Sequence, residues 1–587
     1  MPSMPLRHIA CAALGALLLT ACAVKLSADK AVDLTLIHMG DIHGHLIPRP
    51  NARVDSQGGA LEGGLAHMAT RIREIRAAQP NNLLINTGDT VQGSAEALFT
   101  RGQAVIDVLN RFGIDAYTPG NWEFVYGTAH FLRMFAGDKP LAPWGTVAAN
   151  VYYDGAPFAS QTGQRVLPPY TIKNVGGVKV GILGMTTDRG PQVVGRNVTQ
   201  GFRFLRNAKQ AGEVLSEVDA EVKRQVEQLR SVEKVQVLVL ASELGLANNI
   251  RIAENVAGID VIVSSDMHEQ TREPVLTAGG TLIVEEGQDG TMIGQIDLRV
   301  EGGKVVRKQF KPHLITNRIP ADPEIAALVA AVRAPFVTGA RFDGALANPF
   351  NGTKLKTPID TAVGRTAGAL HRSNFAGDSM PAVIEGTAHN FLADAMRAAG
   401  GAEIGAIRGF RYGTHVLPGA LSYEDLYHFM PIGPQVAVGK IKGQQLKQQI
   451  EGAADGSLNP DVSTWTGGWL FGFSGLTMDF DPYQARGARA SNIRVGGTPL
   501  EPNRDYSYAS YWYAADPALI NTVPAAEVRV LKDGDGGALD AVEVVARHVR
   551  SLPSATVPLV DSRIKLLKPL PAPKFGNREV QPLRGVQ

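Results

Sequence analysis

The sequence predicts an α/β fold in the first half of the chain and a mixed α+β domain in the second half. Short apolar runs alternate with helix-like segments from about residue 32 to residue 305, which is typical of buried parallel strands flanked by helices. Acidic residues follow four of these runs: LTLIHMG precedes Asp41, LLINTG precedes Asp89, VLVLAS precedes Glu243 and IDVIVSS precedes Asp266. Ligands of open α/β sheets bind at the carboxyl ends of the strands, so we expect these side chains to meet in one crevice.

Local patterns predict several individual elements. Residues 63–79 form a predicted helix with an apolar face made of Leu65, Met68, Ile72 and Ile75. Residues 207–230 are predicted as one long charged helix, which the strand KVQVLVLA follows. The stretch KNVGGVKVGILGMTT predicts a hairpin that turns at Gly176 and Gly177. IAALVAAVRAPF and AHNFLADAMRAAG are further predicted helices.

The chain of 587 residues is too long for one ordinary domain. We expect a signal peptide over residues 1–21, a first domain over 22–311, a linker over 312–358 and a second domain over 359–567. Residues 568–587 contain four prolines and are expected to form an irregular tail.

The N-terminus has the pattern of an export signal. Its apolar stretch, residues 9–19, is shorter than the roughly 20 residues that a membrane span needs. It ends in Leu-Thr-Ala-Cys22, which resembles a bacterial lipobox and implies cleavage before Cys22 and lipidation of that cysteine. An ordinary cleaved signal with an incidental cysteine is the alternative. Ala23 follows Cys22 instead of an aspartate, so we expect an outer-membrane lipoprotein that faces the periplasm.

Composition narrows the chemistry. The sequence has two cysteines, Cys11 and Cys22, and the first would leave with the signal, which excludes a thiol nucleophile and a cysteine-ligated metal in the mature chain. A net charge of +2 argues against binding of a nucleic-acid polymer over a broad surface. Small anions in a local pocket remain compatible with it.

The residues expected to be metal ligands are two histidines, four carboxylates and one asparagine: Asp41, His43, Asp89, Asn121, Glu243, Asp266 and His268. This set suits a two-metal hydrolytic centre. Each residue also has a structural alternative. Strand-end residues often act as caps or in turns, Glu243 and Asp266 could be carboxylates beside a one-metal site, and His268 could be an ordinary loop histidine.

The motifs Asp41-x-His43, GGLAH, NTGDTVQGS, GNWEF, AANV and VGGVKVGILGMTT, taken in this order, resemble the periplasmic 5′-nucleotidase family. NFLADAM, Gly409-Phe410-Arg411 and SYEDLYHFMPIGP are similar to its second domain. The resemblance implies a four-layer metallophosphoesterase β-sandwich with flanking helices, followed by a 5′-nucleotidase-type C-terminal substrate-binding domain.

The resemblance also implies how the metals would be held. Asp41, His43, Asp89 and His268 would ligate one metal. Asp89, Asn121, Glu243 and Asp266 would ligate the second, where Glu243 and Asp266 replace two histidines of the family pattern. An all-oxygen second site favours Mn²⁺, Mg²⁺ or Ca²⁺ over Zn²⁺, and Mn²⁺ is the single metal we expect most. Asp89 would bridge the metals, and a bridging hydroxide would attack the substrate.

The segment Gly120-Asn121-Trp122-Glu123-Phe124-Val125 departs from the family pattern. Where the family has a His–Asp pair that helps the transition state, this chain has Trp122 and Val125. An indole cannot protonate a leaving group, and losing acid–base help typically costs about 10²–10⁴-fold in rate. Trp122 would wall the pocket or donate to a substrate oxygen, or it would serve core packing. GNWEFVYG, RGFRYG and DAVEVVARHVR resemble a related branch, the SoxB thiosulfohydrolases.

In the second domain, the resemblance implies that Arg411 binds a carboxylate or phosphate through its guanidinium fork. A structural salt bridge is the alternative. The aromatic residues that could stack on a base are Trp469, Phe471, Tyr511 and Trp512, and ordinary core packing is the alternative for each. The Gly-Gly-Asp usual near the second stacking aromatic is absent, and Ala514-Ala515-Asp516-Pro517 stands there.

Three functions follow as hypotheses. The first is a metal-dependent phosphohydrolase that acts on nucleotides or related phosphoesters. The second is a SoxB-like hydrolase that releases sulfate from a cysteine S-thiosulfonate on a sulfur-carrier protein. The third is a lipid-anchored metal- or nucleotide-binding protein with weak or no turnover. The lipid anchor would be the only contact with the membrane in all three.

Overall fold

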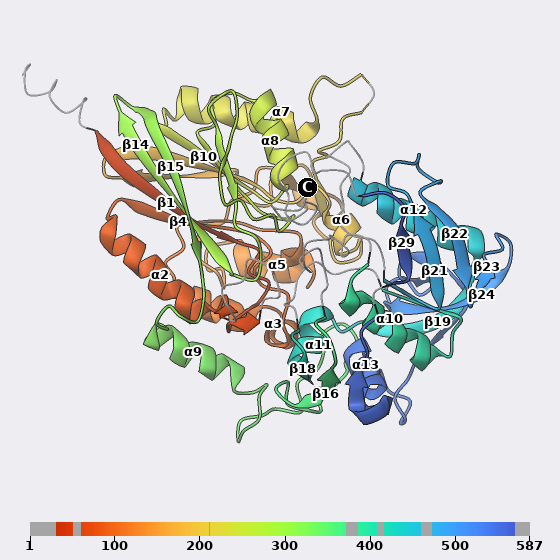
Figure 1. The fold of residues 1–587 in the computed structure, drawn as a ribbon. Helices are drawn as coiled ribbons and strands as arrows, with labels where there is room; N and C mark the ends of the chain where they lie inside the picture. Colours follow the sequence, from red (N-terminus) through yellow and green to blue (C-terminus); the bar gives the residue numbers. More distant parts are fainter. Residues whose placement is uncertain are drawn as a thin grey trace, which may run out of the picture.

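The computed structural model describes residues 31–50, 60–210, 212–370, 385–407, 416–458, 472–560 and 562–569. Figure 1 shows two parts side by side, one drawn in red to light green and the other in teal to blue. In the residues described, we find no helix that is both long enough and apolar enough to cross a membrane.

The first part contains two β-sheets. In the first sheet, β1, β4 and β5 run parallel and two antiparallel strands extend the edge beside β1. Its order is β15 (Lys304–Leu314), β14 (Met292–Glu301), β1 (Val32–Gly40), β4 (Asn82–Thr87) and β5 (Ala116–Thr118). The second sheet has the order β12 (Val275–Leu276), β13 (Leu282–Glu285), β11 (Val261–Ser264), β10 (Val237–Ser242), β8 (Val178–Met185) and β7 (Tyr170–Val175). Its four inner strands are parallel.

The two sheets pack face to face, and helices cover their outer faces. Along β1, Leu34 and Leu36 point into the core between the sheets, whereas Ile37 and Met39 point to the outer helices. The helices on the first sheet are α2 (Leu65–Ala78), α4 (Gln103–Leu109), α5 (Thr128–Phe135) and α9 (Pro323–Arg333). Those on the second sheet are α7 (Glu217–Glu227) and α8 (Leu246–Asn255). The predicted four-layer sandwich is confirmed, and burial on both faces explains why the strands are continuously apolar.

Most of the predicted elements are present. Helix α2 buries Leu65, Met68, Ile72 and Ile75 as expected. Strands β7 and β8 form the predicted hairpin, with positive φ at both turn glycines, Gly176 and Gly177. The helix predicted over residues 207–230 is wrong in its first turns. Helix α7 begins at Glu217 because the Ser216 side chain accepts the Asp219 N–H and caps the helix there.

The second part is built on a five-stranded sheet of mixed direction. Its order is β20 (Gly472–Ser474), β17 (Ile404–Ile407), β24 (Asp505–Trp512), β19 (Gln435–Lys442) and β27 (Ala526–Val530). Helix α10 (Thr387–Gly400) packs on this sheet and also contacts α13 (Ala541–Ser551). Parallel and antiparallel strands occur together in this sheet, which confirms the predicted α+β class.

The two parts contact each other through helix α3 (Ala95–Thr100) of the first and helix α11 (Tyr423–Phe429) of the second. Phe99 and Tyr427 meet edge to face at 5.7 Å between ring centroids. Beside them, the Arg333 guanidinium lies 2.7 Å from a Glu96 oxygen and 2.8 Å from a Glu424 oxygen. Apolar and buried ionic contacts therefore both join the parts.

Candidate metal centre

The strand ends bring the expected ligands to one edge of the sandwich. Asp41 follows β1 directly and Asp89 lies two residues beyond β4. Asn121 lies three residues beyond β5, Glu243 follows β10, and Asp266 lies two residues beyond β11. Because β1, β4 and β5 are parallel, as are β10 and β11, their carboxyl ends lie together within each sheet.

Four of these side chains form a compact buried cluster. Asp41, His43, Asp89 and His268 each offer a ligand atom, and these atoms lie within 4.8 Å of one another. The two histidine Nε2 atoms are 2.9 Å apart, and the Asp41 Oδ1 lies 3.7 Å from that of His43 and 3.6 Å from that of His268. Ligands about 2.0–2.2 Å from one ion are separated by such distances, so the cluster fits a divalent metal.

A backbone carbonyl holds the His43 ring on the side opposite its Nε2 atom. Its Nδ1 lies 3.2 Å from the carbonyl oxygen of Gln92, which can only accept a hydrogen bond. The proton therefore belongs on Nδ1, and the lone pair on Nε2 faces the cluster. Partners of this kind set the tautomer and orientation of histidines that bind metals.

The backbone at the cluster is unusual. Asp41, His43, Asp89, Asp266 and His268 all have positive φ, between 44° and 90°. Non-glycine residues rarely adopt this region, which costs on the order of 1–3 kcal/mol each and is concentrated at functional sites. These five residues therefore carry backbone strain that the surrounding fold must stabilise.

Two glycines allow the strand-end loops to approach each other. A Cβ atom on Gly120 would lie 2.3 Å from Asp89 Oδ1 and 2.4 Å from Glu243 Oε1. A Cβ atom on Gly88 would lie 2.4 Å from the Gly120 nitrogen. Neither position has room for a side chain, so glycine is required for the close packing of these loops.

Asn121 and Glu243 present buried acceptors next to the cluster. Asn121 donates from Nδ2 to Asp266 Oδ1 at 3.1 Å, and the Ser265 hydroxyl donates to Glu243 Oε2. Among the described residues, Asn121 Oδ1 and Glu243 Oε1 have no hydrogen-bond partner. Burial and the nearby carboxylates of Asp89, Asp41 and Asp266 raise the pKa of Glu243 well above its usual range. Buried acceptors without partners are costly, and a cation would satisfy them.

Both carboxylate oxygens of Asp266 accept hydrogen bonds from side chains. Oδ1 accepts from Asn121, and Oδ2 lies 2.5 Å from Nη2 of Arg189. Arg189 lies in the loop after β8 and precedes the short helix α6 (Gly190–Val193). We had not expected this arginine at the site. Its one signal in the sequence is its place just beyond GILGMTT at a strand end.

Glu123 is a second residue that our sequence reasoning missed. Its buried carboxylate accepts backbone N–H groups of Gly120 at 2.6 Å, Asp89 at 2.9 Å, Thr90 at 2.7 Å and Val91 at 3.2 Å. Burial raises the pKa of Glu123, and these backbone hydrogen bonds lower it in part. Glu123 thus ties the loop that carries Asp89 to the loop that carries Asn121. The signal was its place in GNWEF.

Trp122 lies beside the cluster and also packs between the two parts. Its backbone N–H donates to Asp89 Oδ1 at 2.9 Å. Its side chain is 8% exposed and packs in an apolar cluster with Val125 and Ile432, the last of which belongs to the second part. The position where the family has an imidazole is therefore filled by an indole in apolar contact.

The remaining expected site residues lie away from the cluster or outside the described residues. Tyr511 is buried in a core cluster that joins the second part to helix α3. The Trp512 indole N–H donates to the carbonyl of Pro517 at 3.1 Å. Their role in stacking stays a prediction. Arg411, Trp469, Phe471 and Cys22 lie outside the described residues.

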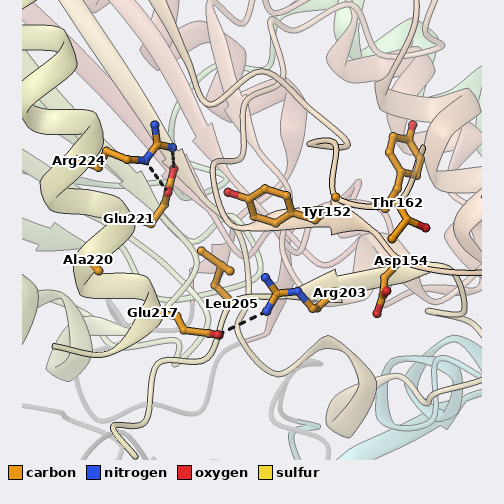
Figure 2. Close-up of a pocket in the computed structure, with 11 residues that line it drawn as sticks. Tyr152, Asp154, Thr162, Arg203, Leu205, Glu217, Ala220, Glu221 and Arg224 are labelled. Atoms are coloured by element: carbon orange, nitrogen blue, oxygen red, sulfur yellow. Dashed lines mark hydrogen bonds and ion pairs between the residues drawn. The ribbon is translucent and has the colours of Figure 1, made fainter. Parts of the chain in front are cut away.

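A pocket of about 510 Å³ lies elsewhere in the first part, beside α7 (Figure 2). Its charged groups pair with one another. Arg203 lies 3.4 Å from Glu217, and Arg224 lies 2.6 Å from Glu221. The Tyr152 ring lies above Arg203 in the view of Figure 2. Asp41, His43, Asp89 and His268 do not line this pocket, so we place the candidate site at the strand-end cluster.

Comparison with known proteins agrees with this geometry. A family model described as calcineurin-like phosphoesterase matches residues 34–270, and one described as 5′-nucleotidase, C-terminal domain, matches residues 362–518. Protein UshA of Yersinia enterocolitica is 24% identical over 524 residues, which cover 83% of this chain and 86% of UshA. Endonuclease YhcR of Bacillus subtilis is 23% identical over 558 residues, which cover 92% of this chain but 41% of YhcR.

Among solved structures, the sulfate thiohydrolase SoxB of Thermus thermophilus, in complex with glycerol, superposes with a TM-score of 0.73 and 22% identity. The match covers 91% of this chain and 96% of SoxB, and it shows a shared fold. Members of the matched families are hydrolases that act on phosphoester bonds and bind divalent metals. With a calcineurin-like phosphoesterase domain followed by a 5′-nucleotidase C-terminal domain, the chain belongs to the 5′-nucleotidase family of metallophosphoesterases.

Proposed function

We propose that this protein is a metal-dependent hydrolase that cleaves a phosphoester of a nucleotide or a related small anionic substrate. The observation that carries the proposal is the buried cluster of Asp41, His43, Asp89 and His268, whose ligand atoms lie within 4.8 Å of one another. The proposal includes export and a lipid anchor at Cys22, which place the reaction in the periplasm.

The residues of the site would have separate roles. Asp41, His43, Asp89 and His268 would hold one divalent ion, and the acceptors of Asn121 and Glu243 would meet a second next to Asp89. Divalent ions in such a site supply Lewis acidity and a nucleophile at neutral pH. Mn²⁺ is the metal we propose, because carboxylate and amide oxygens dominate the second position.

The neighbours of these ligands keep them in place. Glu123 anchors the loop of Asp89 through three backbone N–H groups and joins it to the loop of Asn121 through the N–H group of Gly120. Trp122 would exclude water from the side of the site that faces the second part, since its indole packs against Ile432. Exclusion of water strengthens electrostatic interactions with a bound anion.

A SoxB-like reaction is the second candidate. In it, sulfate would be released from a cysteine S-thiosulfonate carried by a partner protein. The specific observation in its favour is Trp122, which fills with an indole the position where phosphoester hydrolysis would gain from an acid–base group. A substrate whose leaving group needs little protonation would suit this site.

A panel of substrates separates the candidates. Mature protein stripped of metal and reloaded with Mn²⁺ would be offered AMP, ATP, a cyclic nucleotide, bis-p-nitrophenyl phosphate and a cysteine S-thiosulfonate. Asp89→Asn is the blank. We expect release of phosphate or p-nitrophenol that needs Mn²⁺ and is lost in the blank. Sulfate release alone would assign the protein to the SoxB-like reaction, and bound metal without any turnover would make it a binding protein.

A further inference from the structure

We propose that Arg189 binds an oxyanion of the substrate next to the metal, and that Asp266 anchors Arg189 instead of ligating metal. This inference rests on the proposed function in taking a tetrahedral oxyanion, a phosphoryl or sulfonyl group, as the substrate. It assigns a substrate-binding role to an arginine that the sequence patterns do not single out.

The first argument is the way Asp266 is held. Oδ2 of Asp266 forms a charge-assisted contact of 2.5 Å with Arg189 Nη2, and Oδ1 accepts the Asn121 amide at 3.1 Å. Its backbone N–H also lies 3.2 Å from an Asp41 oxygen. The Asp266 side chain is 1% exposed. Asp266 is therefore held by a donor on each oxygen, and one of these donors is a cationic guanidinium.

The second argument is that the first metal position has four ligands without Asp266. The group of described side chains whose ligand atoms come within 4.8 Å of one another consists of Asp41, His43, Asp89 and His268. Asp266 lies on the same loop as His268 and has a positive φ of 90°. The loop therefore turns His268 toward the metal position and Asp266 toward Arg189.

The third argument is where the guanidinium sits. Helix α6, which Arg189 precedes, contacts the short 3₁₀ turn Trp122–Phe124, and Val194 packs in the apolar cluster of Trp122. Arg189 thus lies at the start of a helix that packs beside Trp122. Its side chain is 15% exposed, so it is shielded but reachable.

The chemistry of the two residues is complementary. Trp122 provides no acid, and a guanidinium does not give up its proton at neutral pH, so Arg189 would act by charge and geometry. Its planar fork matches two oxygens of a phosphoryl or sulfonyl group. Asp188 supports the guanidinium from the other side, with 3.6 Å between its Oδ1 and Arg189 Nε. A positive charge also offsets the surplus of carboxylates around Glu243.

The test measures metal content and anion binding separately. Wild type, Arg189→Gln, Arg189→Lys and Asp266→Asn would be loaded with Mn²⁺, and metal per chain counted by mass spectrometry. Binding of inorganic phosphate and of sulfate would follow by calorimetry. Arg203→Gln is the matched control, because Arg203 also pairs with a carboxylate but lines the pocket of Figure 2. Circular dichroism would verify that each variant is folded.

We expect Arg189→Gln and Asp266→Asn to keep the wild-type metal count and to bind phosphate about ten- to hundredfold more weakly, the loss typical of a hydrogen bond to a charged group. Arg189→Lys should fall between, because it keeps the charge and loses the fork. A double variant, Arg189→Gln with Asp266→Asn, should bind phosphate no more weakly than either single variant, since the two residues act as a unit.

Loss of metal in Asp266→Asn with a normal count in Arg189→Gln would overturn the inference and make Asp266 a ligand. Wild-type protein that binds neither anion, or Arg189→Gln that binds them normally, would overturn it too. The proposed function fails separately. If no phosphoester is hydrolysed but anion binding depends on Arg189, the oxyanion site stands while the reaction assigned to it falls.

Discussion

His43 and His268 point their Nε2 atoms at each other across 2.9 Å, although 225 residues separate them in the chain. Each ring comes from a loop that follows a different sheet, and each residue has a positive φ. Two buried lone pairs at this distance repel each other unless a proton or a cation lies between them. The proposed hydrolase rests on this convergence.

Replacement of His268 by glutamine should remove the metal. The substitution removes one of four ligands. Loss of a residue that only hydrogen-bonds to a ligand lowers metal affinity roughly 10–100-fold, so we expect loss of the ligand itself to lower it by at least that much. His313→Gln is the control, because His313 contacts Gln295 on the first sheet. Mass spectrometry of both variants after gel filtration checks the result. Equal metal content in the two would contradict the assigned cluster.

Glu123→Gln should destabilise the protein. The carboxylate accepts four backbone N–H groups, and an amide would turn a donor toward some of them. Leaving a buried donor unsatisfied costs about 1–3 kcal/mol. Urea unfolding measures the difference, with Glu227→Gln on the exposed side of α7 as the control. A Glu123→Gln variant as stable as that control would show that Glu123 is not a structural anchor.

Arg333→Met should destabilise the contact between the two parts. Arg333 is 11% exposed, and its removal leaves the buried carboxylates of Glu96 and Glu424 without it. Breaking a buried ion pair in this way costs about 3–5 kcal/mol. Arg307→Met is the control, since that arginine is 64% exposed and should contribute less than about 1 kcal/mol. Comparable denaturation midpoints for the two variants would refute the role of Arg333.

Asp540 should make stability depend on pH. Burial raises the pKa of Asp540 to about 7, well above the value of about 3.9 in an unfolded chain. The folded state then binds more protons between these values. The contribution to the free energy of unfolding is therefore fully present below about pH 4, declines as the pH rises to about 7, and is absent above it.

Asp540→Asn should abolish that decline, because asparagine does not ionise yet still caps α13 as Asp540 does. The stability difference between the variant and wild type should change by on the order of 1–3 kcal/mol across the window. Unfolding in urea at a series of pH values measures it, with exposed Asp516→Asn as the control. A difference that stays constant with pH would contradict the raised pKa.

The sequence was informative where a residue's role follows from its place after a strand. Asp41 and Asp89 could be located because parallel strands bring their carboxyl ends together, and the structure places both in the cluster. The sandwich could be predicted because its strands are continuous apolar runs, which are buried on both faces. These features depend on local pattern and on topology.

Features that depend on which distant side chains meet could not be predicted. Arg189 and Asp266 are 77 residues apart, and no spacing rule pairs them. The sequence did not decide whether Trp122 lines the pocket or packs in a core. Its contact with Ile432 depends on how the two parts pack against each other. The start of α7 was misplaced because charged residues before Ser216 have helical character, while the Ser216 cap decides where the helix begins.

The most direct test of the account is a Mn²⁺ titration of metal-stripped protein, with hydrolysis of AMP and of bis-p-nitrophenyl phosphate followed together with bound metal. The account predicts that phosphoester turnover rises in step with occupancy in the wild type and in His313→Gln, and that Asp89→Asn stays inactive throughout. Turnover that persists without metal, or a fully loaded wild type that cleaves neither phosphoester, would contradict it.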